Sequence, residues 1–227
     1  MKKGTLYGVG VGPGDPELLT IKAVRILREA DAVAVPDTGS GDKAALAIAQ
    51  SYIAGKELIL CPSPMSGNRR EADACYDETA KILAERLSNG DNIAFITLGD
   101  PSVYSTYCYI QKRVAAMGFE TQTIPGITSF CAAAARLGES LCEGKEPLVI
   151  VPASSMKPEA WIGLPGNKVL MKAGGKMPAL TAALGRIDAD IAAVTNCGME
   201  GESVARGAEE LDASAGYFSV IVVKERH

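Results

Sequence analysis

The chain has 227 residues, of which 47% are apolar, a formal net charge of −4 and one histidine, His227. This length and apolar content support one large or two small domains with a buried core. The negative charge disfavours a general nucleic-acid-binding protein, whose phosphate contacts need a basic surface. With only a terminal histidine, a Ser-His-Asp hydrolase and a histidine-based metal site are all but excluded.

The apolar runs are interrupted by Gly, Pro or charge well before the roughly 20 residues that span a bilayer. The N-terminal stretch has no small-residue cleavage site. None of the six cysteines pairs with another at a two-residue spacing, so we expect reduced and mostly buried thiols. We therefore expect a cytoplasmic protein with no metal, no membrane partner and no nucleic-acid partner.

The N-terminal half alternates strands with helices. Residues 4–11 predict a strand that ends in a glycine-rich loop, and Thr20 is the expected N-cap of the amphipathic helix that follows. We expect three further elements before the polar stretch "SPMSGNRREA": a strand over 32–35 stopped by Pro36, an alanine-rich helix over 43–53 and a strand over 58–61. A long amphipathic helix then ends at Asn89-Gly90, and the apolar residues 92–98 predict a strand covered on both faces.

The pattern restarts after Gly118. It predicts a strand near 121–124 and a helix over 128–137, then strands at 148–151, 168–171, 191–194 and 217–223 with a helix over 177–186. Alternation of this kind indicates right-handed βαβ units and an α/β fold with mostly parallel or mixed sheets. We expect two domains, residues 1–120 and 121–227.

The glycine-rich loop "GVGVGPGDP" does not fit a dinucleotide-binding fingerprint. No register gives glycines at the three spacings of G-x-G-x-x-G, and two prolines remove backbone N–H donors that a pyrophosphate would need. The loop suits either the close packing of its helix or the approach of a neutral or cationic ligand. A second loop, Gly99-Asp100-Pro101, follows the buried strand, so both loops are expected at one edge of the sheet.

Three stretches carry a resemblance that covers nearly the whole chain: "GVGVGPGDPELLTIKAVRILREADAVAVP", "LGDPSVYSTY" and "IPGITSFCAAAARLG". In this order and spacing they resemble the S-adenosylmethionine-dependent tetrapyrrole (corrin and porphyrin) methylases. The resemblance implies two α/β domains with an interdomain cofactor cleft, and commonly a homodimer. Within the family, "SVYSTYCYIQKR" and "AVAVPDTGSGDKAALAIA" are most similar to precorrin-2 C20-methyltransferases, including those that take the cobalt form.

The resemblance implies S-adenosylmethionine as cofactor and assigns residues to it. The positions that match cofactor contacts are Pro13, Leu98, Gly99, Asp100, Val103, Thr128, Ser129, Met171 and Gly198. Thr128 is expected to cap its helix, to offer its hydroxyl to the methionine carboxylate, or both. Because the sulfonium loses positive charge as the methyl leaves, a carboxylate touching it would favour the ground state. Asp100 is therefore expected to organise its loop or face the substrate.

The implied reaction is transfer of the methyl group to an electron-rich meso carbon of a reduced tetrapyrrole, followed by loss of a proton. Asp100 and Tyr104 are the candidate bases, and Tyr104 is equally a candidate stacking wall. The acetate and propionate arms of such a substrate need cations. The clusters near the expected site are Arg69, Arg70, Lys112, Arg113 and Lys172, although charges of this kind are more often a solvated helix face.

Three alternatives stay open from the sequence. The first is methyl transfer to another ring position of the tetrapyrrole, and the second is methyl transfer to a diphthamide precursor. The third is that the protein is a catalytically silent tetrapyrrole carrier. Pro13 and Asp100 are expected at exposed loop tips, so that replacing both with alanine would weaken cofactor binding without unfolding the protein.

Overall fold

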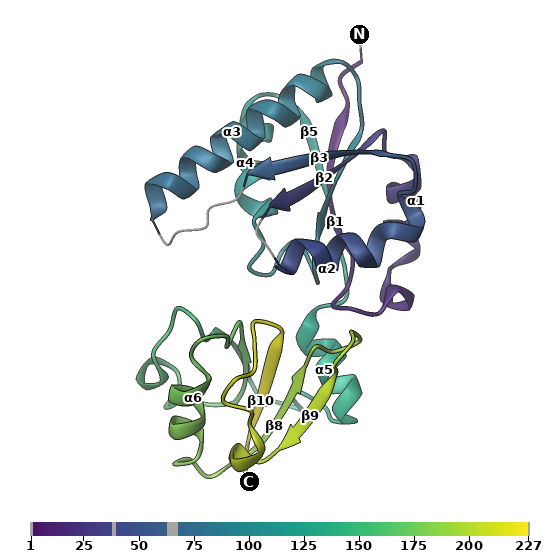
Figure 1. The fold of residues 1–227 in the computed structure, drawn as a ribbon. Coiled ribbons are helices and arrows are strands. Elements are labelled where there is room, and N and C mark those ends of the chain that lie inside the picture. Colours follow the sequence, from purple (N-terminus) through teal and green to yellow (C-terminus); the bar gives the residue numbers. More distant parts are fainter. Residues whose placement is uncertain (1, 38–39, 63–67, 227) are drawn as a thin grey trace. The chain divides into compact units, whose positions relative to one another are not determined.

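The computed structural model describes residues 2–37, 40–62 and 68–226 (Figure 1). The chain forms two compact units, the first ending at Thr128 and the second beginning at Ser129. Residues 63–67 of the expected polar loop "SPMSGNRREA" lie outside the described residues, as does His227. Each unit has its own sheet and its own core.

The first unit is built on a five-stranded sheet in the order β3-β2-β4-β1-β5. Every pairing in it is parallel. The strands are β1 (Thr5–Gly10), β2 (Ala32–Asp37), β3 (Glu57–Pro62), β4 (Ile93–Thr97) and β5 (Glu120–Ile124). The carboxyl ends of all five strands therefore lie at one edge.

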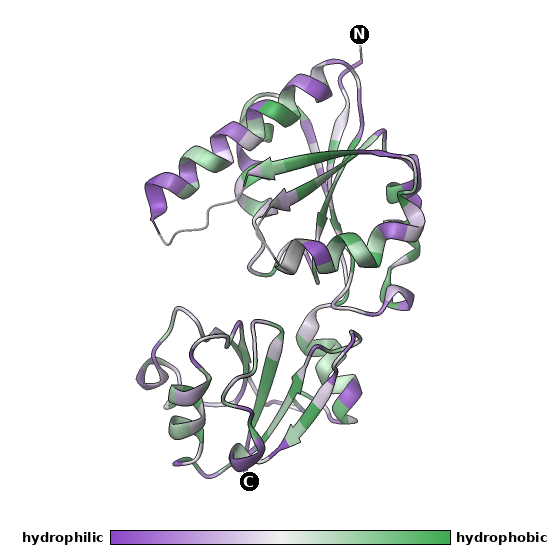
Figure 2. Ribbon diagram, viewed as in Figure 1, coloured by the Kyte–Doolittle hydropathy of each residue, from purple (hydrophilic) through white to green (hydrophobic). Residues whose placement is uncertain are grey.

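Helices cover both faces of this sheet. Side chains of α1 (Ile21–Glu29) and α2 (Ser40–Ala49) pack in one cluster with Val9, Val33 and Ile96. Side chains of α3 (Arg69–Ser88) and α4 (Tyr107–Ala116) pack in another with Leu6 and Phe95. Figure 2 shows the hydrophobic colour concentrated on the strands between these layers. The doubly covered parallel sheet predicted from the sequence is confirmed.

The residues that cap α1 and α3 lie where the sequence predicts them. Thr20 Oγ1 accepts a hydrogen bond from the amide of Ala23 at 3.1 Å and caps α1. After α3, Asn89 is the C-cap and Gly90 has a φ of 98°. Both helix boundaries follow from these residues.

Pro36 does not end β2, as the sequence had suggested. It pairs in register with Cys61 of β3, while the pairing of β2 with β4 stops at Ala34. A proline is tolerated there because no second neighbour needs its missing N–H.

The division between the units also lies later than residue 120. β5 pairs with β1 along its whole length, from Thr5 opposite Glu120 to Val9 opposite Ile124. This strand belongs to the first sheet, so the chain leaves the first unit only after Thr128.

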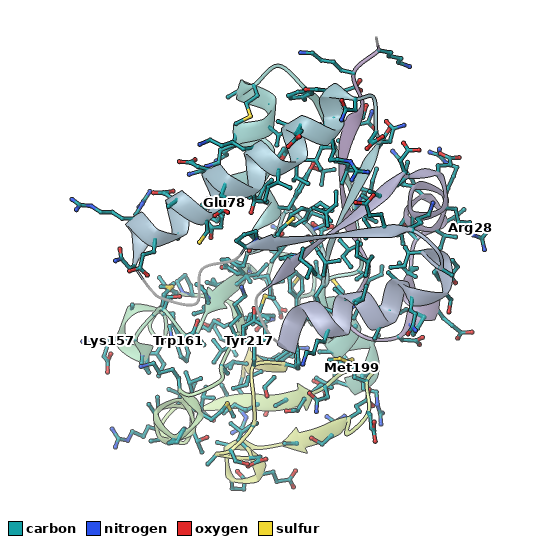
Figure 3. All side chains as sticks on the ribbon, turned by 45° about the horizontal axis from the view of Figure 1, so that its top comes forward. Arg28, Glu78, Lys157, Trp161, Met199 and Tyr217 are labelled. Carbon is teal, nitrogen blue, oxygen red and sulfur yellow. The ribbon has the colours of Figure 1, made fainter. Side chains whose placement is uncertain are left out.

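The second unit has a mixed sheet in the order β6-β7-β10-β8-β9. It follows α5 (Ser129–Leu137) and consists of β6 (Leu148–Pro152), β7 (Asn167–Met171), β8 (Ala189–Thr195), β9 (Ser203–Arg206) and β10 (Ser219–Glu225), with α6 (Met177–Leu184) between β7 and β8. β10 is antiparallel to β7 and β8, so β6, β7 and β8 point the same way. Trp161 is fully buried in the core of this unit, and its position is labelled in Figure 3.

Short 3-10 helices complete the chain at Pro16–Leu18, Gln50–Tyr52, Pro158–Ala160 and Ala208–Glu210. Neither α4 nor β9 was predicted from the sequence. The expectation of mostly buried cysteines was wrong: Cys61 and Cys197 are buried, Cys75 and Cys108 are half-buried, and Cys131 and Cys142 are exposed. Within the described ranges, no helix is both long enough and apolar enough to cross a membrane.

Candidate functional site at the carboxyl edge of the first sheet

The loops after β1 and β4 meet at the carboxyl edge of the first sheet. Gly12 and Gly99 form an antiparallel bridge, in which the amide of Gly99 donates to the carbonyl of Gly12 at 2.8 Å and the reverse bond is 3.3 Å. The helices that follow β1 and β4 pack on opposite faces of the sheet. Adjacent strands whose connections leave to opposite faces form the point where open α/β sheets bind ligands. The predicted meeting of the two loops is confirmed.

A third loop, after β5, joins them through glycines. A Cβ on Gly126 would lie 2.2 Å from the carbonyl oxygen of Gly99, and one on Gly10 would lie 2.6 Å from the amide nitrogen of Gly126. No side chain fits at either position without moving the backbone. Residues 10–14, 97–104 and 125–128 are called the loop cluster below.

Gly8 of β1 has a different role from Gly10. A Cβ on Gly8 would lie 2.2 Å from the ring of Tyr107, which is fully buried and donates its hydroxyl to the carbonyl of Gln122 at 2.7 Å. Burial raises the pKa of Tyr107 to about 12. Gly8 thus serves the packing of α4, and the repeated glycines of this loop have separate causes.

Asp100 ties the loop cluster together. Its Oδ1 accepts hydrogen bonds from the amide and the hydroxyl of Ser102, and its Oδ2 accepts one from the amide of Gly126 at 2.9 Å. The side chain is only 9% exposed. Asp100 therefore organises its own loop and fixes the loop after β5, which is the first of the two roles expected from the sequence.

The expectation that Pro13 and Asp100 lie at exposed loop tips was wrong, because both are buried. The glycines let the three backbones approach so closely that Asp100 is enclosed between them and reaches the amide of Gly126. Leu98 and Val103 are half-buried beside them. Tyr104 is 44% exposed and has a φ of 48°, a conformation in which a bulky residue is strained.

The cluster also offers an open position and an orphan hydroxyl. A Cβ built on Gly99 would meet nothing closer than the carbonyl oxygen of Ile127 at 4.0 Å. Thr128 Oγ1 is buried and makes no hydrogen bond with any part of the chain that the structure describes. Thr128 thus does not cap α5, contrary to one of the uses expected for it. A buried hydroxyl without a partner costs free energy unless a ligand satisfies it.

Replacing Thr128 with valine is expected to leave the free energy of unfolding unchanged or slightly raised, because the hydroxyl has no protein partner to lose. The dissociation constant of S-adenosylhomocysteine should rise about tenfold to hundredfold, the usual effect of one lost hydrogen bond to a charged group. Isothermal titration calorimetry measures it. Thr181→Val is the matched control, since Thr181 Oγ1 is also buried without a partner but lies on α6. Equal weakening by the two variants would contradict the assignment.

The basic residues expected near the substrate separate into two groups. Arg69, Arg70 and Lys112 are exposed, the first two at the start of α3 and the third on α4. The guanidinium of Arg113 instead donates to Asp77 at 2.6 Å and Asp73 at 2.8 Å, both on α3. Those carboxylates satisfy Arg113, so the structure gives it a role in joining two helices.

The remaining predicted residues lie in the second unit. Met171 ends β7 and Gly198 follows β8, so both lie at the carboxyl edge of the parallel strands of that sheet. Lys172 has a φ of 58° and its ammonium lies 5.5 Å from the ring centre of Tyr217, which is labelled in Figure 3. Ser129 begins α5.

Sequence reasoning missed Gly126 and Ser102 as parts of the site. Both lie inside the quoted motifs, but neither carries a group that signals chemistry by itself. Their importance comes from where Asp100 reaches, which depends on the pairing of β5 with β1.

The fold and the loop cluster together define an α/β protein with a candidate ligand-binding edge at the switch point of a parallel sheet. Residues 5–212 match the sequence profile of the Tetrapyrrole (Corrin/Porphyrin) Methylases. The chain belongs to this family. Its members use S-adenosylmethionine as methyl donor.

Relatives and a solved structure agree with this membership. The chain is 32% identical to the cobalt-precorrin-2 C(20)-methyltransferase of Salmonella typhimurium, over 98% of this chain and 97% of that protein. It is 31% identical to a precorrin-2 C(20)-methyltransferase of Sinorhizobium, over 97% and 95%. The fold is also that of the uroporphyrin-III C-methyltransferase of Thermus thermophilus, solved with S-adenosylhomocysteine, with a TM-score of 0.72 at 20% identity over 98% of both chains.

Proposed function

We propose that the protein transfers a methyl group from S-adenosylmethionine to C20 of precorrin-2 or of its cobalt form, a step of cobalamin biosynthesis. The observation that carries this proposal is the near-complete alignment, at 31% and 32% identity, with two proteins named for methylation at C20. The reaction forms a carbon–carbon bond, breaks the sulfur–methyl bond and releases the proton of C20.

The residues of the loop cluster fit the cofactor. S-adenosylmethionine supplies a methyl group activated by its bond to a positively charged sulfur. The open position over Gly99 leaves room for a ligand against the backbone, and the Thr128 hydroxyl is a donor for the methionine carboxylate. The carboxylate oxygens of Asp100 accept hydrogen bonds from Ser102 and Gly126. Asp100 therefore does not stabilise the positive charge of the sulfonium, which must disappear in the transition state.

Of the two candidates for accepting the C20 proton, Tyr104 is better placed than Asp100. The oxygens of Asp100 accept three hydrogen bonds inside the loop cluster. The ring of Tyr104 is nearly half exposed at the end of the same loop. We propose that Leu98 and Val103, which are half-buried, supply an apolar wall there, and that Pro13, Met171, Gly198 and Ser129 contribute cofactor contacts, as the family resemblance implies.

A methyl-transfer assay tests the proposed function. The purified protein, S-adenosylmethionine and either tetrapyrrole are incubated without oxygen, and mass spectrometry should detect one added methyl group, which product NMR should locate at C20. Methylation at another ring position would correct the regiochemistry, and no transfer to any reduced tetrapyrrole would refute the proposal. Calorimetry that finds tetrapyrrole binding without cofactor binding would favour a carrier.

We further propose that the protein acts in the cytoplasm, as its composition suggests, and as a homodimer, as the family resemblance implies. The free state of all six cysteines agrees with a reducing compartment. Analytical ultracentrifugation should give twice the chain mass of 23.7 kDa, and a monomer at micromolar concentration would contradict this assembly.

A further inference from the structure

The first half of α3 extends beyond the sheet that its second half covers. Thr79 Oγ1 donates to the carbonyl of Pro62 at the end of β3, at 3.2 Å, so earlier residues lie past the carboxyl edge. At 1.5 Å per residue, Arg69 lies about 15 Å beyond Thr79. All the buried residues of α3 come at or after Thr79 (Thr79, Ala80, Leu83 and Leu87). Figure 1 shows this end of α3 reaching past β3, and Figure 2 shows that it is hydrophilic, so core packing does not account for it.

A pair of tyrosines joins this extension to the first turn of α4. The rings of Tyr76 and Tyr109 are stacked, with centres 4.9 Å apart and planes 4° apart. Tyr109 is 50% exposed, although an aromatic ring usually buries most of its surface. It follows Tyr104 by five residues, at the start of the helix that leaves the loop cluster. The exposed ring therefore lies at the ligand-binding edge.

Arg113 holds the stacked pair in place. Besides its bonds to Asp73 and Asp77 of α3, it donates to the carbonyl of Tyr109 at 3.2 Å, and its guanidinium carbon lies 5.4 Å from the ring centre of Tyr76. A ring fixed before the ligand arrives loses little conformational freedom on binding. Arg113 is thus a positioning residue for an aromatic surface.

We propose that Tyr109, backed by Tyr76, is a stacking platform for the macrocycle of the tetrapyrrole, an inference that rests on the function proposed above. The substrate is a broad unsaturated ring with carboxylate arms, which needs an aromatic surface under the ring and cations at its rim. Arg69 and Arg70 are exposed at the tip of the same extension and supply those cations. The platform explains why the helix and its tyrosine continue past the sheet.

Replacing Tyr109 with leucine tests the platform, because leucine keeps an apolar side chain but cannot stack. The KM for the tetrapyrrole should rise about fivefold to tenfold, the range expected for one aromatic contact, with kcat within about twofold. The dissociation constant of S-adenosylhomocysteine should not change. Tyr109→Phe should behave like the parent. Tyr52→Leu is the matched control, since Tyr52 also lies against an arginine, Arg28, but follows α2 on the other face of the sheet.

The same variants separate this inference from the proposed function. A folded Tyr109→Leu protein with the KM of the parent would overturn the platform while the methyl-transfer function stands. Absorbance titration of the tetrapyrrole gives a second readout that needs no turnover. A parent protein that binds the tetrapyrrole without methylating it refutes the proposed function. In that case, weaker binding by Tyr109→Leu still supports the platform, and equal binding overturns it.

Discussion

Replacing Gly126 with alanine is expected to destabilise the protein by about 3 kcal/mol and to abolish measurable cofactor binding. The added Cβ would lie 2.2 Å from the carbonyl oxygen of Gly99 and 2.8 Å from the carbonyl carbon of Gly10, and both are backbone atoms that cannot swing away. Overpacking of this kind costs about 1–3 kcal/mol or more. The three loops would have to separate, and the amide of Gly126 would leave Asp100.

Urea denaturation followed by circular dichroism measures the stability change, and calorimetry with S-adenosylhomocysteine measures the binding. Gly216→Ala is the control, because a Cβ there meets nothing within 4 Å and its φ is not in the left-handed region. It should change the free energy of unfolding by less than about 0.5 kcal/mol. A Gly126→Ala protein as stable as Gly216→Ala would show that the glycine junction is not needed.

Replacing Asp100 with alanine should cost about 2–4 kcal/mol and weaken S-adenosylhomocysteine binding at least about tenfold. The carboxylate is 9% exposed, and its loss leaves the amide of Gly126 and both donors of Ser102 without their acceptor. Gly126 is half-buried, so its amide left without an acceptor costs about 1–3 kcal/mol, and the bonds lost at the exposed Ser102, which water can replace, add about 1 kcal/mol. Asp100→Asn keeps one acceptor oxygen and should give an intermediate loss.

The chain offers a matched control for Asp100 in its other Gly-Asp-Pro sequence. Asp15 also accepts a bond from the amide two residues ahead, from Glu17 at 2.8 Å, but it caps a short 3-10 helix at the surface. Asp15→Ala should cost about 1 kcal/mol or less, as for an ordinary cap. If the two alanine variants lost the same stability and the same affinity, the link from Asp100 to Gly126 would not matter.

The contrast between these two Gly-Asp-Pro tripeptides shows which features of the structure can be predicted from the sequence and which cannot. Alternation of apolar strands with amphipathic helices was enough to predict the parallel first sheet, and the carboxyl-edge rule was enough to bring Gly12 and Gly99 to the same place. Identical Gly-Asp-Pro sequences cannot reveal that only Asp100 reaches a third loop. That contact depends on β5 adding to β1, a pairing between residues more than 100 positions apart.

Charge patterns predicted the roles of residues less well than apolar patterns predicted the fold. The sequence predicts the same substrate-binding role for Arg69, Arg70 and Arg113. The structure shows that Arg113 instead forms ion pairs with Asp73 and Asp77, which lie one helical turn apart on α3. The helix α4 was not predicted, although its buried Tyr107, Ile110 and Val114 have helical spacing, because Cys108 and Tyr109 add apolar side chains outside that stripe and obscure the pattern. Its buried face is set by Gly8, which admits the ring of Tyr107.

The central claim is that the loop cluster at the ends of β1, β4 and β5 binds the methyl donor. Amide hydrogen exchange with and without saturating S-adenosylhomocysteine tests it most directly. Exchange should slow in peptides covering residues 10–14, 97–104 and 125–128, and should stay unchanged at residues 88–92, at the opposite edge of the same sheet. Bound ligand with unchanged exchange across residues 97–104 would contradict the account.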